Sequence, residues 1–482
     1  MIFVAKESTS SSPNASAATE AQTAPPGRRW FSISAAHTVA LALVDQAAVS
    51  GTRFAATIFV GRWAGKEALG DYYLAFSMVM LALCVHEALV ALPYNVFVQR
   101  WSADSARSGR YTYATLLLTV YSGLILTGFF AIAAAAIWLV GHPVGFGPVA
   151  AAATAAVPML FLVEFARRHA LAHFAPWRAV RIDWACAAIQ VGGLFLLARV
   201  GLLTPVNAYL VFAAGYAVVA VAWWSAGGTR REQPASLIAT TIRHWRFGRW
   251  VFATQLMQTL RGAAAPWIAA LLLSKAEAGQ LAAFLTIVLL ANPFLLSINN
   301  ILSPSLTRTL RHEGPVRMRS ALIAGTAWLA LSMTVLGTLL AVFSPPILAL
   351  LFGREYVDRT HVVPVLALAM VIEAAGMPSI NGLWALRKGR ANFLANSAGA
   401  AVTIAGCSLL TFYDGLFGAA CGLVLGRCVS TLWQMAACLQ AIDRAAEMPQ
   451  SSAAMDASLR GRQGRRPTGA AAPDPKPAPV GR

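Results

Sequence analysis

The stretch that decides the fold is DQAAVSGTRFAATIFVGR, residues 45–62. Read as an α-helix, it carries one polar row, made of Gln46, Ser50, Arg53 and Thr57 at i, i+4, i+7 and i+11. Asp45 lies beside this row, and the opposite face is apolar. If such a helix crosses a membrane, its arginine and aspartate must face other helices or a watery cavity. The stretch therefore predicts a membrane helix that lines a functional site.

The composition indicates a polytopic α-helical membrane protein. Of the 482 residues, 57% are hydrophobic and 12% are charged, about half the roughly 25% typical of soluble domains. The net charge of +18 lies in short clusters between apolar segments, as in the cytoplasmic loops of membrane proteins. We therefore expect no nucleic-acid partner. The alternating pattern of a membrane β-barrel does not occur in the sequence.

The apolar segments predict about twelve transmembrane helices in two lobes of six. The expected helices are 34–61, 71–99, 112–140, 146–166, 178–199, 204–225, 248–273, 277–302, 319–343, 361–386, 391–413 and 416–443. The expected divisions are a disordered N-terminal tail at 1–30, an N-lobe at 31–225, a linker at 226–247, a C-lobe at 248–445 and a disordered basic tail at 446–482. A Pro-rich segment at 344–360 is expected to lie at the membrane interface.

The distribution of basic residues supports this topology. With the N-terminus inside, the inner loops hold 21 arginines and lysines and the outer loops hold 6. An excess of arginine and lysine is typical of the cytoplasmic loops of membrane proteins. We therefore expect both termini, including the two tails, to be cytoplasmic.

The two halves of the chain also resemble each other. Arg53, Lys66 and Gly70 recur as Arg261, Lys275 and Gly279, with offsets of 208 or 209 residues. Two six-helix repeats that both start inside are parallel, and their pseudo-two-fold axis runs along the membrane normal. We therefore expect Arg53 and Arg261 to face each other across a central cleft.

The polar residues of these helices form a candidate substrate cavity. Its predicted lining is Arg53, Arg261, Gln46, Ser50, Gln255, Gln258 and Asn299. Paired arginines match phosphate oxygens and stay charged at any pH, so an anionic, phosphate-bearing substrate fits this lining. An internal ion pair of Arg53 with Glu87 or Asp45 is the alternative. Asp45, Glu87 and Glu373 are candidates for ion or proton coupling.

The first two helices resemble a known family. VDQAAVSGTRFAATIFVGRWAGKEALGDYYLAFSM, residues 44–78, and EALVALPYNVFVQR, residues 87–100, resemble the opening of polysaccharide (O-antigen or exopolysaccharide) flippases. These belong to the multidrug/oligosaccharidyl-lipid/polysaccharide (MOP, MATE-like) exporter superfamily. The shared features are Asp45-Gln46, Ser50-Gly51, Arg62 and the run from Gly70 to Tyr73, and the likeness is specific over residues 39–100.

The resemblance implies a fold and a function. It implies two six-helix lobes with a cationic central cavity, in the bacterial inner membrane. It further implies flipping of undecaprenyl-pyrophosphate-linked oligosaccharide repeat units by alternating access. Membrane lipids, a polysaccharide polymerase and other assembly proteins are then the expected partners. Arg53 and Arg261 are carried over by position in the cavity alone, since no motif of the family names them.

Other functions were weighed against this one. A peptidoglycan-precursor flippase is a close relative of it. A cation-coupled multidrug exporter of the same fold would favour an acidic cavity, and the two arginines argue against it. A membrane enzyme of polysaccharide assembly needs a large outer loop or an acidic catalytic motif, and neither occurs in the sequence. We therefore expect a non-enzyme without cofactor or metal.

Overall fold

The computed structural model describes residues 33–101, 104–140, 145–229 and 233–447, and all the regular elements of these ranges are helical. The expected N-terminal tail at 1–30 lies outside the described residues, as does the expected tail at 446–482 apart from its first two residues. The first group of helices is α2 (Ile33–His86), η1 (Glu87–Ala91), α3 (Leu92–Arg100), α4 (Ser105–Val140), α5 (Gly147–Ala172), α6 (Pro176–Arg199) and α7 (Pro205–Ser225). The second is α8 (Leu237–Leu272), α9 (Lys275–Val288), η2 (Leu289–Ala291), α10 (Asn292–His312), α11 (Gly314–Leu351), η3 (Arg354–Tyr356), α12 (Val362–Ala385) and α13 (Gly389–Glu447).

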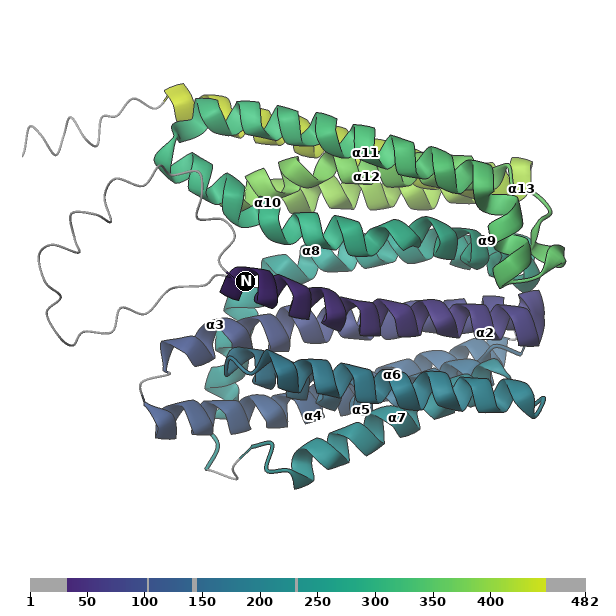
Figure 1. Cartoon of the computed structure of the whole chain (residues 1–482), viewed down its shortest axis with the longest axis horizontal. Coiled ribbons are helices and arrows are strands. Elements are labelled where there is room, and N and C mark those ends of the chain that lie inside the picture. The colour runs from purple at the N-terminus through teal and green to yellow at the C-terminus, as the bar shows by residue number, and fades with distance from the viewer. Residues whose placement is uncertain (1–32, 102–103, 141–144, 230–232, 448–482) are drawn as a thin grey trace, which may run out of the picture.

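The helices form two lobes. Figure 1 shows α2–α7, purple to teal, below, and α9–α13, green to yellow, above, with α8 between them. Two of the long helices are folded back on themselves. The first, α2, reverses at Gly65, whose φ of 87° suits glycine, and α13 breaks at Asp414 and Gly415. Each of these helices therefore crosses the bundle twice, and each lobe contains six crossings as expected.

The crossing helices are those of a multi-pass membrane protein. Among the described residues, nine helices are long and apolar enough to span a bilayer. Helix α8 is not one of them, although it is 36 residues long. Its middle carries Gln255, Gln258 and Arg261, which lower its hydropathy. A crossing helix with so polar a face has to line a cavity.

The lobes meet tightly at the end of the bundle where α2 reverses, here called the Gly65 end. A Cβ at Gly70 would overlap the carbonyl oxygen of Lys275, and a Cβ at Gly279 would overlap that of Lys66. These reciprocal contacts follow the two-fold relation predicted from the repeat. The Lys275 Nζ atom also lies 2.8 Å from Asp71 Oδ2, which joins α9 to α2.

Several helix boundaries differ from the prediction. The second crossing is interrupted by a π-helical turn, η1, just before Pro93. The region at 344–360 is not a separate interfacial segment throughout, because α11 continues through Pro345 and Pro346 to Leu351. The second part of the expected linker belongs to α8, which begins at Leu237. The difference that matters most for the site is that α5 runs to Ala172, beyond the predicted end at residue 166.

Candidate functional site

Two large cavities lie in the interior, one in each lobe. The N-lobe cavity has a volume of about 610 Å³ and is walled by α2, η1, α5, α6 and α7, together with α8 and Leu296 of α10. The C-lobe cavity also has a volume of about 610 Å³ and is walled by α8, η2, α10, α12 and α13. Gln255 and Gln258 of α8 line both cavities. Helix α8 is therefore their common wall.

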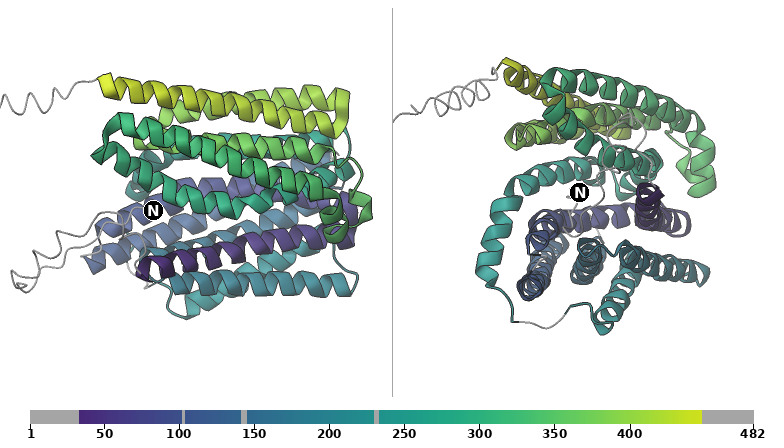
Figure 2. Two further views of the ribbon diagram at one scale, coloured as in Figure 1. Left: turned by 45° about the horizontal axis from the view of Figure 1, so that its top comes forward. Right: turned by 60° about the vertical axis from the view of Figure 1, so that its left-hand side comes forward.

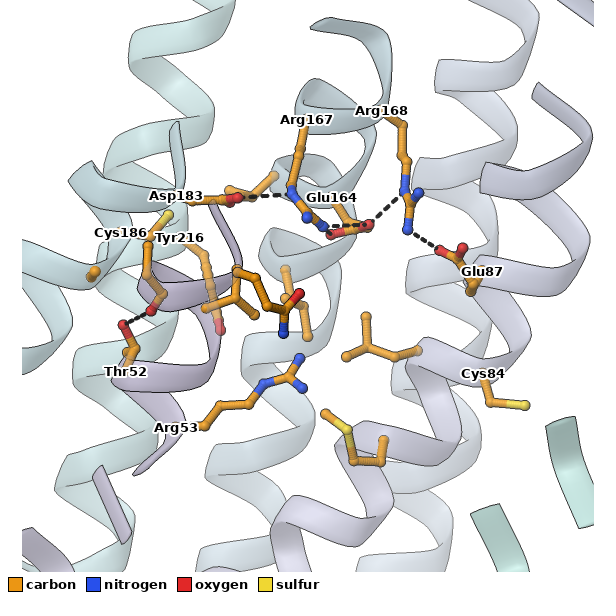
Figure 3. Close-up of a pocket in the computed structure, with 18 of the residues that line it drawn as sticks. Thr52, Arg53, Cys84, Glu87, Glu164, Arg167, Arg168, Asp183, Cys186 and Tyr216 are labelled. Atoms are coloured by element: carbon orange, nitrogen blue, oxygen red, sulfur yellow. Dashed lines mark hydrogen bonds and ion pairs between the residues drawn. The ribbon is translucent and has the colours of Figure 1, made fainter. Parts of the chain in front are cut away.

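The N-lobe cavity is organised by α5. Glu164, Arg167 and Arg168 are spaced i, i+3 and i+4, so all three project from one face of this helix. Glu164 lies 2.8 Å from Arg168 and 3.4 Å from Arg167. These ion pairs within α5 orient both guanidinium groups toward Glu164, without a contribution from another helix (Figure 3).

Three further carboxylates reach these arginines from other helices. Arg167 contacts Asp45 of α2 at 2.7 Å and Asp183 of α6 at 2.8 Å. Arg168 contacts Glu87 of η1 at 2.8 Å. We call Asp45, Glu87, Glu164, Arg167, Arg168 and Asp183 the N-lobe ion network. Its four carboxylates outnumber its two arginines, and its members are 7–27% exposed.

Arg53 lies in the same cavity but outside this network. Its side chain extends from α2 toward the middle of the cavity (Figure 3), and its guanidinium carbon lies 5.9 Å from the centre of the Phe76 ring. Among the described residues it forms no ion pair, because Asp45 and Glu87 are bound to Arg167 and Arg168. The alternative prediction that Arg53 pairs with one of these carboxylates is therefore wrong. Its charge remains available to a ligand.

The C-lobe cavity has fewer charges. Arg427 of α13 is paired with Glu373 of α12, whose side chain is 43% exposed. Arg261 of α8 is 4% exposed, and its Nη1 donates to Ser430 Oγ at 2.7 Å. The Nε of Arg261 has no partner among the described residues. Two arginines thus face one carboxylate in this lining.

The structure separates some of the predicted site residues. Arg53 lines the N-lobe cavity and Arg261 the adjoining C-lobe cavity, so the face-to-face arrangement of the two arginines remains a prediction. Gln46 lines the N-lobe cavity and donates to Ser50 at 2.7 Å. Asn299 lines the C-lobe cavity and accepts from Asn381 at 2.7 Å. The coupling candidates Asp45, Glu87 and Glu373 are each paired with an arginine.

The sequence reasoning missed most of the N-lobe ion network. The 21 basic residues that the sequence places in the inner loops include Arg167 and Arg168, whereas the structure places these two inside the cavity. The signal that could have found them is Glu164, which at i−3 and i−4 favours a continued helix with paired charges. The position of Asp183 in an apolar helix was a second signal. Among the described residues no group of metal-binding side chains occurs.

Comparisons with known proteins identify the fold. No protein-family model matches the chain, and no curated protein matches it by sequence. A solved structure of an inward-facing multidrug resistance MATE family transporter of the MOP superfamily matches with a TM-score of 0.71 and 13% identity, over 83% of this chain and 95% of that one. The lipid II flippase MurJ, in an inward closed conformation, matches with a TM-score of 0.64 and 13% identity, over 82% and 87%.

A third similar structure is a MOP superfamily transporter from Pyrococcus furiosus, described as having a binding pocket of reverse polarity that suggests a different function. Its TM-score is 0.63 at 12% identity, over 85% of this chain and 95% of that one. These likenesses show that the chain has the fold of MOP superfamily transporters. That fold confirms the all-α, two-lobed architecture predicted from the sequence.

Proposed function

We propose that this chain flips undecaprenyl-pyrophosphate-linked oligosaccharide repeat units across a membrane for polysaccharide (O-antigen or exopolysaccharide) biosynthesis. The observation that carries the proposal is the unpaired guanidinium of Arg53 in a 610 Å³ cavity. A guanidinium at membrane depth costs several kcal/mol unless it is paired or hydrated. A pyrophosphate supplies the missing anion and matches the planar donor pattern of arginine.

The fold suits a substrate with a polar head and a lipid tail. The two cavities offer Gln255 and Gln258 on their common wall, and these side chains can bind sugar hydroxyls. The lobes are closed against each other at the Gly65 end by Gly70, Gly279 and the Asp71–Lys275 pair. Opening there and closing at the other end would expose the head group alternately to the two sides. The chain moves its substrate and does not change its bonds.

The setting follows from the same proposal. We place the chain in the bacterial inner membrane with both termini in the cytoplasm, which agrees with the positions of the basic loops in the sequence. A polysaccharide polymerase and other assembly proteins would act on the product. We assign the lobes to residues 31–225 and 248–445. The N-terminal turns of α8, which begins at Leu237, contact the first lobe through His244, whose ring lies 2.7 Å from the Tyr111 hydroxyl and 3.0 Å from the Leu89 carbonyl oxygen.

A second candidate function is export of cationic drugs. The N-lobe ion network favours it, because four carboxylates exceed the two arginines to which they are bound. Such an acidic excess attracts cations. The unpaired Arg53 in the same cavity opposes it, because a fixed positive charge repels a cationic guest.

Lipid analysis of a deletion strain separates the two functions. We expect a complete repeat unit to accumulate on undecaprenyl pyrophosphate while the surface polymer disappears. Unchanged lipid intermediates together with increased sensitivity to cationic drugs would overturn the proposal in favour of drug export.

Complementation of this strain then tests Arg53 directly. We expect Arg53→Ala to reduce surface polymer at least tenfold, because it removes the unpaired charge that faces the substrate. Arg199→Ala is the matched control, since Arg199 lies at the end of α6 and stacks on Phe195 outside both cavities. Full activity of the double variant Arg53→Ala/Arg261→Ala would contradict a role for the cavity arginines.

A further inference from the structure

The C-lobe cavity has hydrogen-bond donors that the protein itself does not satisfy. Arg261 is 4% exposed and makes one side-chain hydrogen bond, to Ser430, while its Nε lacks a partner among the described residues. Asn392 of α13 is fully buried, and its Nδ2 also lacks a partner there. Leaving a buried donor unpaired costs roughly 1–3 kcal/mol. Within the described part of the chain, the lining also holds one unpartnered acceptor, Gln255 Oε1, so the unpartnered donors outnumber the acceptors and favour a ligand that accepts hydrogen bonds.

The orientation of the Asn392 amide is fixed by its surroundings. Its Oδ1 accepts from Gln434 Nε2 at 2.8 Å and from Asn396 Nδ2 at 3.2 Å. If the amide were reversed, its nitrogen would face two other hydrogen-bond donors. The hydrogen-bond network therefore assigns Nδ2 as the atom without a partner. The unsatisfied group at this position is therefore a donor, as it is at Arg261.

The charges that line the cavity favour an acceptor with a negative charge. Arg261 and Arg427 outnumber Glu373, so the lining carries an excess positive charge. The carboxylate of Glu373 is bound to Arg427. Glu373 is 43% exposed and also lines a neighbouring cavity of about 340 Å³. The Glu373 carboxylate can therefore separate from Arg427 and remain exposed, without being buried as an unpaired charge.

We propose that the C-lobe cavity is a phosphate-binding subsite in which Glu373 holds the place of the ligand. An entering phosphate or pyrophosphate group displaces the Glu373 carboxylate from Arg427 and accepts hydrogen bonds from Arg261 and Asn392. The lipid-linked source of this anion rests on the proposed function, whereas the subsite itself does not. Glu373 thereby acts as an internal competitor that limits affinity and aids release of the anion.

The test measures binding of inorganic pyrophosphate to the purified full-length protein, by thermal-shift titration at matched ionic strength. It uses the Arg53→Met background, so that the N-lobe guanidinium cannot contribute. We expect saturable stabilisation that Arg261→Met or Arg427→Met weakens at least tenfold in apparent Kd. Arg199→Met in the same background is the control and should bind like its parent. Loss of binding in the Arg53→Met parent would overturn the subsite.

Glu373→Gln provides a variant whose expected effect is a gain. Because the neutral amide competes less well for Arg427, we expect pyrophosphate to bind about three- to tenfold more tightly. Misfolding cannot produce such a gain. Unchanged or weaker binding would contradict the place-holding role of Glu373.

A comparison of ligands identifies the source of the anion. Geranyl pyrophosphate should bind at least tenfold more tightly than inorganic pyrophosphate if a lipid-linked group is the ligand. Equal affinities would assign the subsite to a free phosphate anion and would count against the lipid-linked source. If the subsite binds pyrophosphate but the deletion strain accumulates no lipid-linked repeat unit, the subsite stands and the proposed function fails.

Discussion

The two lobes share one architecture but treat their charges differently. In the N-lobe, four carboxylates surround Arg167 and Arg168, while Arg53 of the same cavity has no counter-ion among the described residues. In the C-lobe, Arg427 pairs with the half-exposed Glu373, and Arg261 has no ion-pair partner in the part of the chain that the structure describes. Buried ion networks hold helices in a fixed geometry, and breaking them leaves uncompensated charges. From this difference we infer that the N-lobe ion network serves mainly the structure, whereas Arg53 and the C-lobe charges serve mainly the ligand.

Removing Arg167 should have the largest effect on stability. Arg167→Ala leaves Asp45, Asp183 and Glu164 without their shared cation, and each of them is at most 16% exposed. Breaking a buried pair in this way costs about 3–5 kcal/mol. We expect loss of folded protein in fluorescence-detected size-exclusion chromatography. Asp183→Asn in the same chain should recover part of the loss, and absence of recovery would show that packing rather than charge was lost.

Removing Arg168 should have a smaller effect. Its partner on η1, Glu87, is 27% exposed, so water compensates part of the lost charge. We expect Arg168→Ala to destabilise the protein by about 2–3 kcal/mol, between a buried and an exposed ion pair. Thermal unfolding of Arg168→Ala, measured beside whatever folded Arg167→Ala can be purified, shows which of the two substitutions destabilises the protein more. An equal or larger loss for Arg168→Ala would mean that burial does not rank the two arginines.

The ion pair of the C-lobe, between Arg427 and Glu373, should contribute less to stability than Arg167 or Arg168 does. Since Glu373 is 43% exposed, its pair with Arg427 resembles a surface ion pair, which contributes up to about 1 kcal/mol. We expect Arg427→Ala to unfold within a few degrees of the wild type. A loss as large as that of Arg167→Ala would remove the contrast between the lobes and would assign Arg427 a structural role.

Arg53 should have the smallest effect on stability. Its side chain is exposed to the cavity and pairs with no carboxylate among the described residues. We expect Arg53→Met to leave the free energy of unfolding within about 0.5 kcal/mol of the wild-type value, the range of ordinary exposed substitutions; thermal unfolding of the purified variant measures it. A clear stabilisation would show that the charge of Arg53 destabilises the folded protein.

The sequence predicted the architecture well because length, apolarity and repeated residues determine it. The pairing of Gly70 with Gly279 followed from a 209-residue offset and reappears as the reciprocal contact between the lobes. The candidate site was predicted less well, because ion pairs between helices depend on rotations that spacing within one helix does not encode. Asp45 was assigned to ion coupling or to Arg53, and only the packing of α5 against α2 shows Arg167 as its partner.

The crossing of Gly70 and Gly279 has a mechanical consequence. Backbone touches backbone there, so the crossing can serve as a fulcrum with the rest of each lobe as its lever arm. At 1.5 Å per residue, the thirty residues from Gly70 to Arg100 span roughly 45 Å. A rotation of about 10° at the fulcrum then moves the far end by roughly 8 Å. A larger side chain in place of either glycine would therefore displace the helices most at the opposite face of the membrane.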